Sequence, residues 1–246
     1  LTKAKAIGYD VPKEIMDNGV DYLKKLVRNN PVDRYGVFYW HNTNAFALAV
    51  LADHDVYDAA SAELLFQRRS ELPLFARAML LQAIVKGGGH KSMAETLRRD
   101  LMNAIKMDPT TAHFEEPELP GSEWSFHSPM RTTAAILQTF IDLDGTNVPW
   151  AEKVVKYMLE ERKQGRWRTT QENLYVFYAL GSYFRNFEDV DPDFKATVRL
   201  AGRQLLSQMY QGRTTQSHTS VTALAGLTSD KPLSLDISKT GSGRLY

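Results

Sequence analysis

The chain has 246 residues, of which 43% are hydrophobic and 11% aromatic, enough for a substantial buried core. Thirty Lys and Arg residues against 29 Asp and Glu residues give a formal charge of +1, so the net charge provides no field that would attract nucleic acid or an anionic membrane. Because the sequence contains no cysteine, disulfides, thiolate metal ligands and cysteine nucleophiles are excluded within these residues.

Neither a targeting signal nor a membrane-spanning segment is expected. No apolar run approaches the roughly 18 residues that a spanning helix needs, so we expect no direct membrane insertion by this segment. Leu1 begins in mixed polar sequence without an initiator methionine or a secretion signal. We therefore expect the chain to be part of a longer protein.

The first half of the sequence alternates between amphipathic and almost wholly apolar helical segments. Residues 12–28 carry an apolar and a charged stripe, which predicts an outer helix with Pro12 in its first turn. Residues 44–53 run through AFALAVL without a polar break, which predicts an inner helix. Further outer and inner pairs are predicted at residues 58–71 with 73–86, 92–106 with 129–143, and 149–163 with 170–184.

The inner helix over residues 170–184 is apolar almost all round. Leu174, Phe177 and Tyr178 lie on one stripe and Val176 and Leu180 on the opposite side, so we expect partners on both flanks. Either Thr169 or Thr170 is expected to cap its first turn, where Gln171 and Glu172 lie.

Repeated helix pairs allow an open superhelix or a closed ring in which inner helices form a barrel. The inner helices have little polar surface to leave wet, which favours the ring. The predicted fold class is therefore mainly α, a partial α/α toroid of helical hairpins over residues 1–189.

A small β-sandwich-like segment is predicted for residues 190–246. Residues 194–200 and 233–238 alternate strictly between apolar and polar, and residues 217–227 are interpreted as a further strand. Gly202 and Gly212 are expected in turns. Because so few strands cannot bury two faces, we expect the missing strands to come from elsewhere in the longer protein.

The sequence resembles the bacterial alpha-2-macroglobulins. The resemblance rests on the order and spacing of several segments over nearly the whole chain, none decisive alone: residues 8–12 (GYDVP), the inner helices beginning at Asn44, Leu74 and Arg131, residues 166–171 (RWRTTQ) and residues 239–246 (KTGSGRLY). It implies the C-terminal part of the thioester-containing helical domain, an α/α toroid, followed by part of the CUB β-domain that is split around it.

The resemblance also implies a function. Members of the family trap proteases: a bait region is cleaved, the molecule rearranges, and a thioester between Cys and Gln acylates the attacker. Proteases and other domains of the same chain would be the partners, the location would be the periplasm or cell envelope, and neither enzyme activity nor a cofactor is expected. Since this chain has no cysteine, either the motif precedes Leu1 or the parent belongs to a thioester-less branch. Four hairpins are fewer than the family's ring contains, which favours truncation.

The resemblance further suggests roles for His41 and four aromatic residues. His41 lies ahead of an inner helix, near where thioester proteins of the complement type place a histidine that relays the acyl group; a packing histidine is the plainer interpretation. The aromatic side chains that would shield a thioester from water, or simply pack, are Tyr39, Trp40, Trp124 and Trp167.

A metal site is not predicted. Glu115, Glu116, Glu118 and Glu123 lie in the loop over residues 109–128 without an ordered ligand spacing, so we interpret it as solvated. Likewise, no histidine pair has zinc-site spacing.

Two alternative functions remain open. An α/α-toroid enzyme of the terpene cyclase or prenyltransferase type is suggested by residues 164–167 (QGRW), but Asp142 and Asp144 look like a helix end rather than the acid that cyclases need. A thioester-less interaction scaffold would follow if the parent lacks both thioester and bait.

Overall fold

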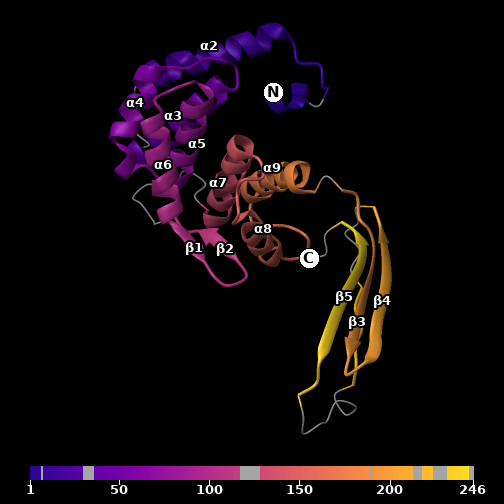
Figure 1. Ribbon diagram of the computed structural model, residues 1–246. Helices are drawn as coiled ribbons and strands as arrows, with labels where there is room; N and C mark the ends of the chain where they lie inside the picture. Colours follow the sequence, from indigo (N-terminus) through magenta and orange to yellow (C-terminus); the bar gives the residue numbers. More distant parts are fainter. Residues whose placement is uncertain are drawn as a thin grey trace. The chain divides into compact units, whose positions relative to one another are not determined.

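The computed structural model describes residues 1–6, 8–29, 36–116, 128–188, 190–212, 218–223 and 232–243. The chain divides into two compact units, Leu1–Tyr183 and Phe184–Tyr246 (Figure 1). The sequence placed the boundary at residue 189, and the assignment of either unit to a particular domain stays a prediction.

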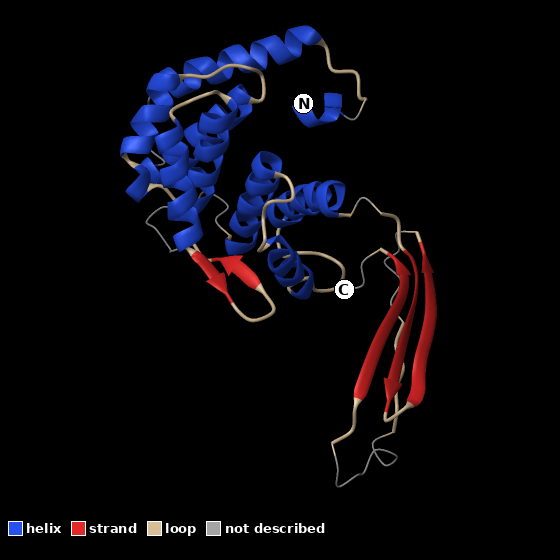
Figure 2. Cartoon of the chain, viewed as in Figure 1, coloured by secondary structure: helices blue, strands red, loops and turns tan. Residues whose placement is uncertain are grey.

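The first unit consists of packed helical hairpins, so the mainly α prediction is confirmed (Figure 2). No helix in the described part of the chain is long and apolar enough to cross a membrane. The elements are α1 Thr2–Ala6, α2 Lys13–Asn29, α3 Gly36–Ala52, α4 Ala59–Gln67, the 3-10 turn η1 Arg69–Glu71, α5 Leu74–Lys86, α6 Lys91–Asn103, α7 Pro129–Asp144, α8 Ala151–Glu160 and α9 Thr170–Phe187.

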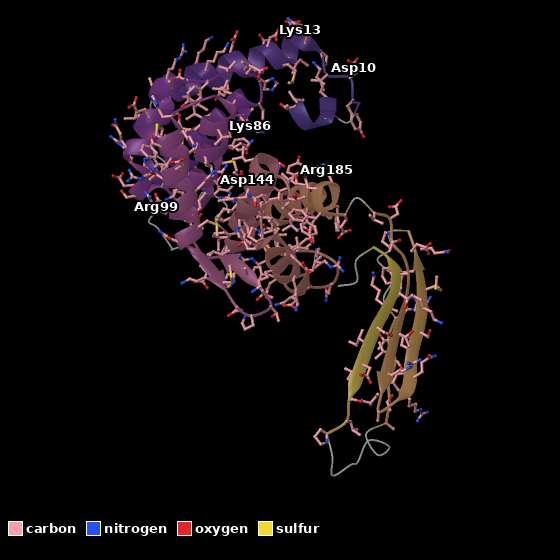
Figure 3. The ribbon with its side chains drawn as sticks, viewed as in Figure 1. Asp10, Lys13, Lys86, Arg99, Asp144 and Arg185 are labelled. Atoms are coloured by element: carbon pink, nitrogen blue, oxygen red, sulfur yellow. The ribbon has the colours of Figure 1, made fainter. Side chains whose placement is uncertain are left out.

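The core of this unit lies along the inner helices α3, α5 and α7. Helix α5 packs against both neighbours, and fully buried side chains such as Leu48, Leu81 and Ile136 come from all three helices. The helices expected outside cover them, with α2 packing on α3, α6 on α5 and α8 on α7. Their polar faces meet solvent, as Lys13 on the outer side of α2 shows (Figure 3).

Helix α9 corrects one prediction, because only one of its flanks is covered within the described residues. Val176 and Tyr183 are fully buried, whereas Leu174 is 42% and Phe177 62% exposed. The buried side packs toward α5 and α7: the ring of Tyr175 lies edge-on to Phe75, 5.4 Å between centroids, and α9 donates a hydrogen bond of 2.8 Å to α7 through a serine hydroxyl. The helices of the unit thus supply partners for one of its two apolar sides.

A short hairpin replaces part of the loop expected after α6. That helix ends at Asn103 instead of continuing to residue 106, and the chain forms β1 Ile105–Met107 paired with β2 Ala112–Phe114. The alternation in β2 buries Ala112 and Phe114, and the strand packs against α7 and α8. The hairpin therefore ties the third helix pair to the fourth.

The second unit contains an antiparallel sheet with the order β4-β3-β5. Strands β3 Asp193–Leu200 and β5 Leu235–Ser242 were predicted, whereas β4 Arg203–Gln211 was not. The β3–β4 turn consists of Ala201 and Gly202, both with positive φ as tight two-residue hairpins require. The strand predicted over residues 217–227 is wrong at residues 218–223, which belong to no strand, and its other residues lie outside the described part.

The side-chain cap predicted at the start of α9 is confirmed, and of the two candidates Thr169 is the cap, in a capping box with Glu172. The Thr169 hydroxyl accepts from the Glu172 N–H at 3.1 Å, and the Glu172 carboxylate accepts from the Thr169 N–H at 3.1 Å. These two bonds satisfy donors that the first helical turn would otherwise leave free.

Replacement of the capping threonine tests this start signal. Thr169→Ala removes the hydroxyl acceptor, so the free energy of unfolding of the 246-residue chain is expected to fall by about 1 kcal/mol in urea denaturation. The matched control is Thr170→Ala, at the exposed first residue of α9, which is expected to change it by less than about 0.5 kcal/mol. Equal effects of the two substitutions would contradict the assignment of Thr169 as the cap.

Candidate functional site

Some of the residues that the sequence singled out, such as His41 and Trp167, lie at or just before the N-terminal end of an inner helix. At the start of α5, Glu116, only 7% exposed, accepts hydrogen bonds from the N–H groups of Leu74 at 3.0 Å and Phe75 at 2.7 Å. It also accepts from the Thr132 hydroxyl at 3.1 Å. One carboxylate therefore caps α5 and joins it to α7, which corrects the interpretation of Glu116 as part of a solvated loop. Its neighbour Glu115 is exposed, whereas Glu118 and Glu123 lie outside the described residues.

A second buried carboxylate joins α7 to α9. Ser128 caps α7 by accepting from the Arg131 N–H at 3.3 Å, and its hydroxyl donates to Glu172. Glu172 is 5% exposed and also belongs to the capping box of α9. The first turns of α5, α7 and α9 are thus held together, so these three helices begin at the same end of the unit.

An arginine and two aromatic rings fill the space beside these carboxylates. Arg131 is 6% exposed, and its guanidinium lies 4.2 Å from the centroid of the Phe75 ring, a cation–π contact. Burial raises the pKa of Tyr175, and the positive charge of Arg131 opposes that shift. The tyrosine therefore stays neutral at physiological pH.

His41 lies within α3 and not ahead of it, because the helix begins at Gly36, eight residues before the predicted start. The residues between Gly36 and the predicted start are uncharged, and they extend the helix at its N-terminal end. The side chain of His41 is 1% exposed, and its Nε2 has no hydrogen-bond partner in the described part of the chain. Burial lowers the pKa of His41, partly offset by the carboxylate of Glu71, so the imidazole is neutral at pH 7.

The proposed aromatic shield is only partly visible. Trp40 is 6% exposed in α3, and its ring centroid lies 5.1 Å from that of His41. Trp167 lies just before α9 and donates from Nε1 to the Met158 carbonyl of α8 at 2.8 Å, which gives it a packing role between these helices. The Tyr39 side chain and Trp124 lie outside the described residues. Among the described residues no contact joins Trp40 to Trp167, so the shield stays a prediction.

The chemistry available at the N-terminal ends of the inner helices depends on the buried polar side chains there. His41 offers a neutral nitrogen that acts as base or nucleophile when a partner reaches it. Without cysteine, the chain itself cannot form a thioester. In the described residues no three histidine or acidic side chains lie close enough to hold a metal ion.

Sequence reasoning missed the burial of two charged residues at the site, Glu116 and Arg131. Both are charged, and a charged residue in a loop or at a helix start is usually exposed. A local signal was present for Glu116, because it continues the alternation of the buried residues Ala112 and Phe114. A carboxylate at a buried position of such an alternating segment needs hydrogen-bond donors, and here the first N–H groups of α5 provide them.

Neither a protein-family model nor a curated protein sequence matches the chain. Solved structures do match. A Salmonella alpha-2-macroglobulin variant superposes with a TM-score of 0.62 at 19% identity, over 85% of this chain and 13% of that chain. Trypsin-activated alpha-2-macroglobulin from Escherichia coli gives 0.59 at 14% identity, over 98% and 14%. A native Escherichia coli fragment from domain MG7 to the C-terminus gives 0.61 at 15% identity, over 85% and 31%.

These comparisons confirm the resemblance at the level of structure. Because the identities are low, they show a shared fold alone, and the chain spans only about an eighth of the two longer neighbours.

Removal of the Glu116 carboxylate tests the organisation of this end. Glu116→Ala leaves two buried N–H groups and the Thr132 hydroxyl without their acceptor, so the free energy of unfolding is expected to fall by about 3 kcal/mol. Glu115→Ala is the matched control, with an expected change under about 0.5 kcal/mol. Both are measured by urea denaturation. A small effect of Glu116→Ala would mean that the starts of α5 and α7 are held together by other contacts.

The burial of His41 predicts a pH dependence of stability. The unfolded chain protonates this imidazole near pH 6.5, whereas the folded chain does so only at lower pH, so protons favour the unfolded state below about pH 6.5. Between about pH 7.5 and about pH 5.5 the wild type is expected to lose more unfolding free energy than His41→Gln, by at most about 1.4 kcal/mol per pH unit. The control His90→Gln keeps the buried imidazole and is expected to follow the wild type. Parallel curves for His41→Gln and wild type would contradict this expectation.

Proposed function

We propose that the chain is the helical scaffold, with part of the adjoining β-domain, of a bacterial alpha-2-macroglobulin-like protein that traps proteases. The observation that carries the proposal is the match to trypsin-activated alpha-2-macroglobulin of Escherichia coli over 98% of the chain. That match extends through both units, in the order in which the sequence presents them. A helical ring alone occurs in many proteins, whereas helical hairpins followed by an antiparallel sheet restrict the comparison.

Proteases are the partners in this proposal, acting through the full-length protein. Two of the similar structures are described as activated by trypsin and by porcine elastase, and a third as reacted with methylamine. Covalent capture would have to use a cysteine outside these 246 residues, since they contain none. In such a protein His41 is the proposed acyl acceptor and Trp40 and Trp167 are part of the proposed shield. The proposed location is the periplasm or cell envelope.

A toroidal enzyme has less support. Asp142 accepts a hydrogen bond from Ser182 at 2.8 Å, and Asp144 pairs with Arg98, so both carboxylates serve the packing of helices. The QGRW turn packs between α8 and α9 through Trp167. A thioester-less scaffold stays the alternative within the same fold, and the experiment below separates it from covalent capture.

The test uses the full-length protein that contains this chain. It is mixed with trypsin and, separately, elastase, and residual protease activity is measured on a small peptide substrate and on a large protein substrate. A trap is expected to preserve cleavage of the peptide and abolish cleavage of the protein, because the enclosed protease admits only small molecules. Equal inhibition of both substrates, or of neither, would contradict the proposal.

Treatment of the full-length protein with methylamine tests whether a thioester is present. Release of a free thiol on treatment, followed by loss of covalent protease adducts on denaturing gels, is expected if a thioester is present. Trapping without thiol release supports a parent from a thioester-less branch, whereas absence of both trapping and thiol release supports the thioester-less interaction scaffold. His41→Ala in the same protein is expected to slow acyl transfer to protease amines and hydroxyls if the relay role holds, and an unchanged rate would remove that role.

A further inference from the structure

The turn between α8 and α9 carries four cationic side chains and no carboxylate. It is defined here as the basic turn, residues 162–168 (RKQGRWR). Its cationic residues are Arg162, Lys163, Arg166 and Arg168, and all four are exposed. Because the whole chain has a formal charge of only +1, the turn is a local concentration of positive charge on a nearly neutral protein.

The backbone of the basic turn is held in a tight conformation. Lys163 and Arg166 form an antiparallel bridge, and their backbones exchange N–H to carbonyl hydrogen bonds of 3.0 and 3.2 Å. Between them Gln164 and Gly165 have φ values of 53° and 80°, as a two-residue turn of this hand requires. Gln164 thus keeps a side chain in a conformation that favours glycine, and residues strained in this way cluster at ligand-binding sites.

Trp167 anchors the basic turn to the helices on both sides of it. Its ring is 4% exposed, and Nε1 donates to the Met158 carbonyl of α8 at 2.8 Å. Asn173 of α9 accepts from the Trp167 N–H at 3.2 Å and donates to its carbonyl at 2.8 Å. The cationic side chains therefore extend from a fixed backbone, which reduces the ordering cost of binding a ligand.

The bridge places two like charges next to each other. Side chains directly opposite in an antiparallel bridge lie on the same face, with Cβ atoms about 5 Å apart, and like charges at this spacing are destabilising. Within the described residues Arg162, Lys163 and Arg166 form no ion pair, and Arg168 lies 3.9 Å from Glu172. An anionic group between Lys163 and Arg166 would turn their repulsion into attraction.

The charge of the basic turn favours phosphate over carboxylate as this group. One carboxylate carries a single negative charge, whereas a phosphate monoester carries about −1.5 to −2 at neutral pH and offers three terminal oxygens. An arginine fork binds two such oxygens at once, and lysine adds a compact positive charge.

Other anionic partners fit the basic turn less well. Seven residues are too short to follow a nucleic-acid backbone, and the buried ring of Trp167 offers no face on which a base could stack. The tip of the turn consists of Gln164 and Gly165, so no apolar side chain there would insert into a bilayer. The features of the turn therefore match a single phosphate group.

From these features we propose that the basic turn binds a phosphate monoester, with Lys163 and Arg166 on either side of the phosphate oxygens. Arg168 adds a third positive charge nearby. The same chemical group occurs on soluble phosphorylated molecules and on the phosphatidic acid headgroup, and the experiment below distinguishes these sources. The proposal does not depend on protease trapping.

The first test titrates the isotope-labelled 246-residue chain with glycerol 3-phosphate and follows the backbone amide resonances of the basic turn. At constant ionic strength and about pH 7.5, this monoester is expected to bind at least about fivefold more tightly than dimethyl phosphate or acetate, which carry one charge each. Its affinity is expected to fall between about pH 7.5 and about pH 5.5, because the phosphate loses its second charge near pH 6.

Substitutions test whether the bridge residues hold the phosphate. Lys163→Gln and Arg166→Gln are each expected to weaken glycerol 3-phosphate binding by roughly fivefold or more, because each removes a charge-assisted contact. The matched control is Arg99→Gln, which removes an exposed arginine of α6 and is expected to leave the affinity unchanged. Circular dichroism checks that each variant is folded.

Cosedimentation with vesicles identifies the source of the phosphate. Binding that requires phosphatidic acid in phosphatidylcholine vesicles, and that Arg166→Gln removes, makes a lipid headgroup the source. Binding of glycerol 3-phosphate without vesicle binding makes a soluble molecule the source. Either result supports phosphate recognition by the basic turn.

Three outcomes would overturn the proposal. One is equal affinity for glycerol 3-phosphate and acetate, and another is an equal effect of Arg166→Gln and Arg99→Gln. The third is tighter binding of a glutamate-rich peptide than of glycerol 3-phosphate, which would make an acidic protein the partner. Failure of protease trapping by the full-length protein would leave this proposal standing, so the two are distinguishable.

Discussion

The need to satisfy buried helix starts organises the helical unit. The first N–H groups of a helix have no partner within it, and the inner helices α5 and α7 begin inside the protein, where water does not provide acceptors. Glu116 and Glu172 meet this need with carboxylates that each bind the first turn of one helix and a hydroxyl next to another. The negative charges also face the positive ends of the helix dipoles. The alignment of α5, α7 and α9 depends on these two residues.

The sequence pattern predicted those features whose stability depends on residues close together in the chain. The apolar run of α5 and the threonine cap of α9 are set by neighbours in sequence, and both were predicted, the cap as either Thr169 or Thr170. Strand β4 was missed because RQLLSQMYQ lacks strict alternation, and its state depends on pairing with β3 through the turn at Ala201. Glu116 was misread because its partners lie about 40 residues away, at the start of α5. Sequence spacing does not encode such a contact.

The burial of His41 has two opposite effects on its proposed role in acyl transfer. Burial keeps the imidazole neutral at pH 7, which is the protonation state that a base or nucleophile requires. The same burial leaves the side chain 1% exposed, so no acyl group from outside reaches it in this conformation. An acyl-relay role therefore requires a rearrangement that opens the start of α3. Large rearrangement is also what protease trapping requires, so the two proposals make the same mechanical demand on this end of the unit.

The coverage of α5 and of α9 differs for a physical reason. Both helices carry apolar side chains on opposite sides, and α5 buries both because α3 and α7 flank it. In the described residues α9 buries only the side that includes Val176 and Tyr183, and Leu174 and Phe177 stay exposed. At about 25 cal/mol per Å² of buried apolar surface, α5 therefore gains more free energy from its neighbours than α9 does. An apolar pattern in the sequence shows which helices can be inner ones, whereas the number of flanking helices decides how much of each pattern is buried.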